Sequence, residues 1–122
     1  RVLDYAKTGF YTNDEIKDID DKTLSNFFYH DNLSDRYGIN DKVKSFIKFG
    51  QLNLIKDKYP DKVDMIFCRN VIIYFDRQTK DKIMANFHNS LEKEGFLFLG
   101  HSESLFNNPL FKFYKPSVYV KI

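Results

Sequence analysis

The stretch from Asp64 to Phe75 (DMIFCRNVIIYF) constrains the fold of this chain more than any other segment. Its first half is apolar and of strand length, as expected of a central parallel strand that is buried on both faces. Arg69 and Asn70 interrupt the apolar run, which then resumes and ends in aromatic residues. Ligands of open α/β sheets bind outside the carboxyl ends of the strands. The stretch therefore predicts an α/β fold with a site directly after this strand.

The segment before this strand predicts a small antiparallel meander. Short aromatic or β-branched runs, separated by turn signals, occupy residues 26–30, 36–39 and 43–49. We expect the last run to continue as a strand of the main sheet. Upstream of the meander, residues 1–8 have helical periodicity, and Gly9 is expected to end that helix.

The segment after this strand predicts a helix and three further strands. Asp76 is placed to cap the helix at its N-terminus, and Gly95 is expected to be its C-cap. The three apolar or aromatic runs that follow are expected to be strands at residues 96–99, 111–114 and 118–120. The apolar face of the helix would consist of Ile83, Met84, Phe87 and Leu91.

Composition and spacing exclude several kinds of site. The net charge of +2 comes from dispersed lysines and predicts no nucleic-acid surface. No apolar run approaches the about 20 residues that span a bilayer, and no signal peptide is visible, so we expect a cytoplasmic protein without membrane insertion. The single cysteine, Cys68, predicts a buried apolar side chain, and no Cys/His cluster predicts a metal site. His101, Ser102 and Glu103 are too close in sequence to form a catalytic triad, and a structural role is favoured.

Four blocks of sequence carry a family resemblance. The block FCRNVIIYFD, from Phe67 to Asp76, resembles the signature of CheR-type chemotaxis methyltransferases. Three further blocks agree with that family in order and spacing: AKTGFY (residues 6–11), FGQLNL (residues 49–54) and GFLFLGHSES (residues 95–104). The resemblance spans essentially the whole chain.

The resemblance implies the C-terminal part of a Rossmann-like, S-adenosylmethionine-dependent methyltransferase fold. Residues 1–122 would be a partial domain, with an inserted antiparallel β-subdomain at about residues 26–46. The chain has five glycines but no G-x-G-x-x-G cluster, so the first strands, the Gly-rich loop and the ribose-binding acid are expected upstream of Arg1. We therefore expect the isolated chain to bind cofactor poorly, to be inactive, and to be only partly stable or to self-associate.

The resemblance also implies an activity. CheR-type enzymes transfer a methyl group from S-adenosylmethionine to glutamate side chains of chemoreceptors, leaving S-adenosylhomocysteine. The implied partner is the cytoplasmic domain or tail of a chemoreceptor. In some members the β-subdomain docks a receptor peptide, and strand addition near Arg36 and Tyr37 is the physical mode that we expect here.

The same resemblance implies roles for five residues. Asn53 and Leu54 would contact the adenine end of the cofactor, and Arg69 and Asn70 its methionine and ribose portions. Tyr74 would lie near the transferring methyl group and orient the carboxylate or the sulfonium. Each of these residues also has a structural alternative. Asn53 could be a turn asparagine. Arg69 could form a salt bridge while Asn70 closes a turn, and Tyr74 could be a packed core tyrosine.

Two other functions stay open at the level of sequence. One is a methyltransferase of the same fold that acts on a small molecule. The other is a non-catalytic module that binds or regulates a receptor. A degraded signature would favour the second, whereas Arg69, Asn70 and Tyr74 are all present.

Overall fold

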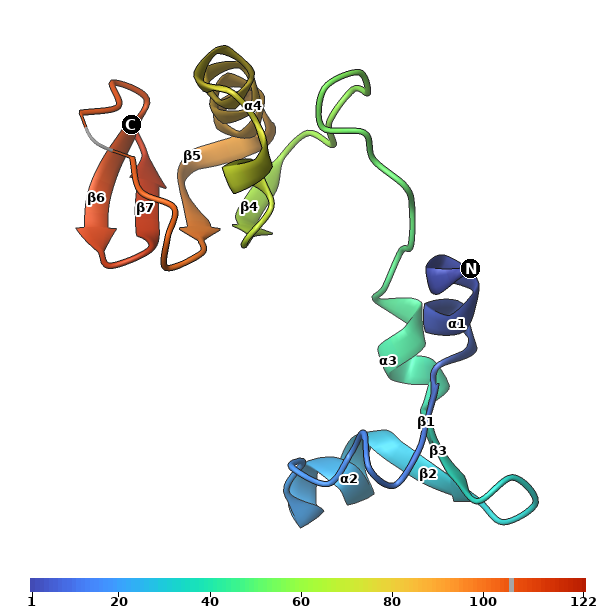
Figure 1. The fold of residues 1–122 in the computed structure, drawn as a ribbon. Coiled ribbons are helices and arrows are strands. Elements are labelled where there is room, and N and C mark those ends of the chain that lie inside the picture. Colours follow the sequence, from blue (N-terminus) through green and yellow to red (C-terminus); the bar gives the residue numbers. More distant parts are fainter. Residues whose placement is uncertain (106) are drawn as a thin grey trace. The chain divides into compact units, whose positions relative to one another are not determined.

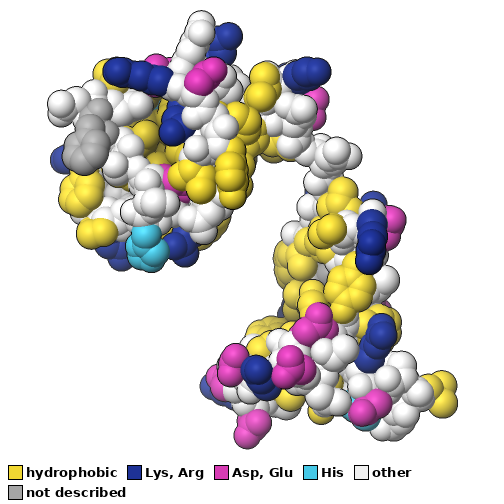
Figure 2. All heavy atoms as spheres, viewed as in Figure 1, with side chains coloured by type: hydrophobic (Ala, Val, Ile, Leu, Met, Phe, Trp, Pro, Cys, Tyr) yellow, Lys and Arg dark blue, Asp and Glu magenta, His cyan; other side chains and the backbone are white. Residues whose placement is uncertain are grey.

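Two sheets organise the chain, one within residues 1–51 and one within residues 52–122 (Figure 1). This computed structural model describes residues 1–105 and 107–122. Within those residues, no helix has both the length and the apolar character that crossing a membrane requires. On the visible surface, Lys and Arg side chains are interspersed with Asp and Glu rather than gathered in one basic patch (Figure 2).

The first unit, residues 1–51, contains an antiparallel sheet of strand order β1-β3-β2. The first helix ends as the sequence predicts, because Gly9 adopts a left-handed φ of 65° at its C-cap. The side chain of Asp20 caps the second helix by accepting a hydrogen bond from the N–H of Thr23. In chain order the elements are α1 (Val2–Thr8), β1 (Phe10–Tyr11), α2 (Asp21–Phe27), β2 (Phe28–Asp31), β3 (Arg36–Ile39) and α3 (Asp41–Ser45).

The prediction of a strand at residues 43–49 is wrong. The side chain of Asn40 accepts a hydrogen bond from the N–H of Val43 at 3.0 Å and begins α3, which ends at Ser45. No strand is assigned between α3 and Val63. The third strand of the small sheet is instead β1, which pairs with β3. Strand propensity is realised only where a neighbouring strand supplies partners, so the local cap determines the conformation here.

A histidine in the first unit gives a pH prediction. His30 Nε2 lies 2.8 Å from Asp35 Oδ1, and His30 Nδ1 lies 2.9 Å from Asn32 Oδ1. The hydrogen bond to Asp35, followed by that to Asn32, raises the pKa of His30 above its ordinary 6.5. The stabilisation of the β2–β3 hairpin by protonated His30 is therefore fully present below pH 6.5 and is lost as pH rises through the raised pKa.

An NMR titration of the His30 ring measures this shift. Asp35→Asn should lower the pKa of His30, whereas Asp14→Asn, which changes an exposed acid elsewhere in the unit, should leave it unchanged. Equal titration curves for the wild type and Asp35→Asn would contradict the assignment of the shift to this hydrogen bond.

The second unit, residues 52–122, contains a mixed sheet of strand order β4-β5-β7-β6. Strands β4 and β5 are parallel, and the β5–β7 and β7–β6 pairs are antiparallel. This arrangement confirms the expected order of a strand, a helix, a strand and a closing strand pair, and it makes the chain a mixed α/β structure. The elements are β4 (Val63–Cys68), the 3₁₀-helix η1 (Ile72–Tyr74), α4 (Arg77–Ser90), β5 (Leu91–Leu99), β6 (Phe111–Lys115) and β7 (Val118–Lys121).

The start of α4 confirms the prediction, and its end does not. The side chain of Asp76 accepts a hydrogen bond from the N–H of Thr79 at 2.8 Å, as expected of an N-cap. The helix ends at Ser90, however, and Gly95 lies inside β5 rather than at a C-cap. A Cβ on Gly95 would lie 2.9 Å from a backbone carbonyl of its own strand, that of Glu92. Glycine is required there by close backbone packing, which the sequence alone does not distinguish from a helix end.

The core of the second unit lies between α4 and one face of the sheet. The predicted apolar face of the helix is confirmed for Ile83, Met84 and Phe87, which are at most 3% exposed, whereas Leu91 is buried as the first residue of β5. The largest fully buried side chains are Ile83, Met84, Leu97 and Leu99. On the opposite face, Phe67 and Phe98 stack at a centroid distance of 4.3 Å, and Phe67 is 67% exposed. The two parallel strands are thus apolar on both faces, as their composition predicts.

Candidate functional site

The candidate site lies where β4 and β5 end. Cys68 pairs with Leu99 at the last position of the parallel ladder, so the loops that follow the two strands begin side by side. The first loop carries Arg69 and Asn70, and the second runs from Gly100. Ligands of open α/β sheets bind at this edge, so a binding site here stays a prediction.

A buried carboxylate joins the two loops. Glu103 Oε1 accepts hydrogen bonds from the N–H of Asn70 at 2.7 Å and from the N–H of Gly100 at 2.8 Å. Glu103 is only 4% exposed, and hydrogen bonds to an ionised acceptor are stronger than neutral ones. We call this arrangement the Glu103 bridge. It fixes the backbone of the first loop relative to the end of β5.

The backbone at the bridge has little freedom. Asn70 adopts a left-handed φ of 61°, which asparagine tolerates better than most residues. A Cβ on Gly100 would lie 2.7 Å from Glu103 Oε1 and 3.0 Å from the backbone nitrogen of Asn70. The local geometry therefore requires glycine at position 100 and favours asparagine at position 70.

Arg69, Asn70 and Tyr74 are all exposed beyond the end of β4. Tyr74 lies on η1 and is 79% exposed, so the interpretation of a packed core tyrosine is wrong. Arg69 forms none of the ion pairs found among the described residues, which are Arg1–Asp4, Lys17–Asp14 and His30–Asp35. The side chains of Arg69 and Tyr74 are thus available to a ligand in this unit.

Asn53 and Leu54 are positioned by a turn. Asn53 Oδ1 accepts hydrogen bonds from the N–H of Ile55 at 2.9 Å and of Lys56 at 3.2 Å. Leu54 is half-buried against the core, and its carbonyl accepts a hydrogen bond from the hydroxyl of Tyr59 at 2.8 Å. The side-chain oxygen of Asn53 therefore has the role of a turn asparagine. A binding role for its side-chain NH₂ group stays a prediction.

Two of the predicted site residues, Leu54 and Arg69, line different cavities. Leu54 lines a cavity against α4, whereas Arg69 lines a second one beside Phe67, Phe98 and His101. Arg69 and Asn70 follow each other at the sheet edge, whereas the cavity that Leu54 lines lies against α4.

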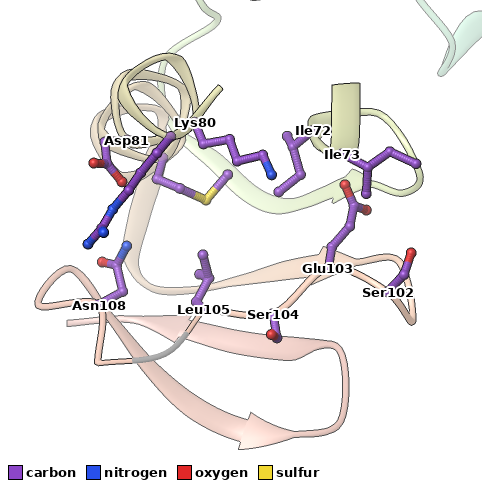
Figure 3. Close-up of a pocket in the computed structure, with 11 residues that line it drawn as sticks. Ile72, Ile73, Lys80, Asp81, Ser102, Glu103, Ser104, Leu105 and Asn108 are labelled. Atoms are coloured by element: carbon purple, nitrogen blue, oxygen red, sulfur yellow. The ribbon is translucent and has the colours of Figure 1, made fainter. Parts of the chain in front are cut away.

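A further cavity, which we call the loop cavity, was missed by the sequence analysis (Figure 3). It has a volume of about 280 Å³ and lies between η1, the first turns of α4 and the loop after β5. Its charged lining residues are Arg77, Lys80, Asp81 and Glu103. The helix spacing of the first three, which places them on one face, was the only signal in the sequence. The participation of Glu103 depends on the loop geometry.

The electrostatics of Cys68 agree with its interpretation as a buried apolar side chain. Desolvation by burial, with a smaller contribution from the negative charge of Glu103, raises the pKa of the Cys68 thiol to about 11. The thiol is 8% exposed and lies in the core. Among the described residues, no group of three His, Cys, Asp or Glu side chains is arranged to hold a metal ion.

We expect Cys68 to be unreactive in the native chain. With a pKa of about 11, roughly 0.1% of the thiol is ionised at pH 8, and the thiolate is the reactive form. Reaction with a disulfide reagent such as 5,5′-dithiobis(2-nitrobenzoate) should therefore be slow in buffer and fast in 6 M guanidinium. Equal rates under the two conditions would show that the thiol is not protected by the fold.

Comparison with known proteins places this geometry in a family. Residues 1–120 match the family model described as CheR methyltransferase, SAM binding domain. The chain is 34% identical over 122 residues to a chemotaxis protein methyltransferase of Borreliella burgdorferi. The aligned region covers 98% of this chain and 43% of that protein. It is 36% identical over 110 residues to a chemotaxis protein methyltransferase of Escherichia coli. That aligned region covers 84% of this chain and 37% of that protein. The chain therefore spans about two fifths of the length of these relatives.

Proposed function

This chain belongs to the CheR methyltransferase family, and on that premise we propose that it takes part in methyl transfer from S-adenosylmethionine to glutamate side chains of chemoreceptors. In this reaction a glutamate oxygen forms a bond to the methyl carbon while the bond from sulfur to that carbon breaks. The products are a glutamate methyl ester and S-adenosylhomocysteine. The observation that carries the proposal is the pair of loops at the ends of β4 and β5, joined by the Glu103 bridge.

The five predicted residues keep their proposed roles. Asn53 and Leu54 would hold the adenine end of the cofactor, and Arg69 and Asn70 its ribose and methionine portions. Tyr74 would orient the attacking carboxylate or the sulfonium. All five lie in the second unit, and the exposure of Arg69, Asn70 and Tyr74 supports roles in contact with a ligand.

The chemistry suits a site without a general base. A glutamate carboxylate has an ordinary pKa of about 4.3 and is ionised at neutral pH, so it needs no deprotonation. S-adenosylmethionine supplies an electrophilic methyl group. The chain's own residues would then bind, orient and shield the two reactants, and orientation alone is worth up to about 7–11 kcal/mol.

We also propose a division of roles between the two units. The second unit would be the C-terminal part of a Rossmann-like cofactor-binding fold, a proposal supported by the strand order β4-β5-β7-β6. The small antiparallel sheet of the first unit would be the inserted β-subdomain, expected at about residues 26–46. That sheet also includes β1, which lies outside the expected range. Its exposed hairpin with Arg36 would dock a receptor peptide by strand addition.

NMR titration of the ¹⁵N-labelled chain with S-adenosylhomocysteine tests cofactor binding. We expect weak, saturable shifts at the amides of Arg69, Asn70 and Gly100. Adenosine alone should shift the amide resonances of Asn53 and Leu54. Homocysteine alone should shift those of Arg69 and Asn70 in the loop after β4, which we call the β4 loop. Separating the ligand into these halves tests each assigned role independently.

Two matched variants complete this experiment. Asn53→Ala should weaken the binding of adenosine, whereas Asn26→Ala, which lies in the first unit, should not. An absence of saturable shifts at millimolar ligand, or equal weakening by both variants, would overturn the cofactor assignment. If the chain binds a receptor peptide but no adenosyl ligand, the non-catalytic receptor-binding module becomes the better interpretation.

Tyr74 gives a kinetic prediction. One hydrogen bond to a charged group contributes about 1.5–3 kcal/mol, so Tyr74→Phe should reduce kcat for methyl transfer about tenfold or more. Transfer of tritiated methyl groups to a receptor cytoplasmic domain, measured with the natural full-length protein, gives the rate. Tyr114→Phe, also an exposed tyrosine of the second unit, is the control. An unchanged kcat for Tyr74→Phe would remove this tyrosine from the reaction.

A further inference from the structure

We infer that the loop cavity binds an amide group of a polypeptide, with Glu103 accepting a hydrogen bond from its N–H and Lys80 donating one to its carbonyl oxygen. The cavity lies beside the candidate site and contains none of the residues assigned to the cofactor. It is lined by α4 on one side and by the loop after β5 on the other (Figure 3).

The first observation is an unpaired acceptor. Glu103 uses Oε1 for the bridge to Asn70 and Gly100. Its other oxygen, Oε2, is buried and accepts no hydrogen bond from the residues that the structure describes. A buried carboxylate oxygen without a donor costs free energy, so Oε2 favours a ligand that brings an N–H group.

The second observation is a cation on the facing wall. Lys80 is half-buried on α4, and its side chain projects into the loop cavity from the wall opposite Glu103 (Figure 3). Within residues 1–105 and 107–122, its ammonium group forms no ion pair. It therefore offers a donor in a cavity where Glu103 offers an acceptor.

The balance of charge selects the class of ligand. Two cationic residues, Arg77 and Lys80, and two acidic residues, Asp81 and Glu103, line the loop cavity. A free anion would be repelled by the buried carboxylate, and a free cation by the ammonium and guanidinium groups. A neutral group that carries a donor on one side and an acceptor on the other satisfies both Glu103 and Lys80, which line opposite walls of the loop cavity. The amide has this pattern, either as a peptide bond or as a glutamine or asparagine side chain.

The identity of the polypeptide rests on the proposed function, because a protein substrate that enters the neighbouring site would bring such groups to the loop cavity. Binding of the amide itself does not depend on methyl transfer. The experiment below contains no adenosyl ligand, so its failure is distinguishable from failure of the cofactor titration.

NMR titration of the ¹⁵N-labelled chain with small amides tests the inference. N-methylacetamide represents the peptide bond, and propionamide represents a glutamine side chain. Acetate, which lacks the donor, and methylammonium, which lacks the acceptor, are the controls. We expect saturable shifts at the amides of Ser102, Ser104 and Leu105 with one or both amides, and the stronger of the two identifies the source of the group.

Three variants locate the binding site. Glu103→Gln keeps an acceptor for the bridge but can place an NH₂ group at the position of Oε2, so amide binding should weaken at least fivefold. Lys80→Met should weaken it at least threefold, whereas Lys82→Met, a lysine of the same helix that does not line the loop cavity, should leave it unchanged. Unaltered shifts at Asn70 and Gly100 would show that the bridge survives in Glu103→Gln.

Two results would overturn the inference. One is that neither amide produces larger shifts at Ser102, Ser104 and Leu105 than acetate and methylammonium do. The other is equal amide affinity in Lys80→Met and Lys82→Met, which stands as a test even if Glu103→Gln disturbs the loop.

Discussion

Replacing Leu97 with alanine should lower the free energy of unfolding by about 2–5 kcal/mol. Leu97 is 0% exposed and lies in β5, between β4 on one side and β7 on the other. Its side chain belongs to the hydrophobic cluster that packs α4 against the sheet. Truncation removes apolar contacts and leaves a cavity in a cluster built from several elements, which cannot all move to fill it.

Urea-induced unfolding of the intact chain, followed by far-ultraviolet circular dichroism, measures this loss. Leu52→Ala makes the same chemical change at a position that is 40% exposed in the same unit, and it should cost much less. Equal costs for the two variants would mean that the second unit does not depend on packing around β5. Hydrogen exchange at the β5 amides should show the same difference, since these amides open only when the core does.

The sheet of the second unit was largely predictable from the sequence. The β4 run is apolar and bounded by turn residues, and Asp76 supplies a local cap that needs no tertiary information. Each of these signals lies within a few residues of the element that it determines. The apolar face of α4 was predictable for the same reason, because helical periodicity fixes which side chains share a face.

Tertiary context explains the two wrong predictions of secondary structure. Residues 43–49 have strand composition, but a strand requires a partner, and the cap at Asn40 forms a short helix instead. Gly95 follows a helical pattern, yet its role is a close approach of backbones inside β5. In both cases the local sequence pattern is real, but contacts with distant parts of the chain determine which structure forms.

The candidate site was predictable in place but not in construction. The polar interruption at Arg69 and Asn70 located the end of β4, because polar groups inside an apolar run need a reason. Glu103, which lies 33 positions after Asn70, is joined to it only by the parallel pairing of β4 and β5. Such a bridge leaves no pattern in the sequence, and neither does the buried, unpaired Oε2 of Glu103, a residue that lines the loop cavity.

Removing the Glu103 bridge should have the largest effect on the site. In Glu103→Ala the N–H groups of Asn70 and Gly100 lose their acceptor, and the N–H of Gly100, which is buried, costs about 1–3 kcal/mol when it is left unpaired. Asn70 would then no longer be held at its left-handed φ of 61°, so the affinity for S-adenosylhomocysteine should fall more than tenfold. Urea unfolding and calorimetric titration measure the two effects.

Two comparison variants separate the bridge from a general loss of charge. Glu92→Ala removes an exposed carboxylate from β5, and it should change neither stability nor affinity substantially. Gly100→Ala keeps the carboxylate but forces a Cβ to within 2.7 Å of Glu103 Oε1, so it should reduce affinity in the same direction as Glu103→Ala. If Glu103→Ala weakens stability while the affinity of the remaining folded chain is unchanged, the bridge supports the fold alone. A joint loss in Glu103→Ala and Gly100→Ala, absent from Glu92→Ala, ties cofactor affinity to the conformation of the β4 loop.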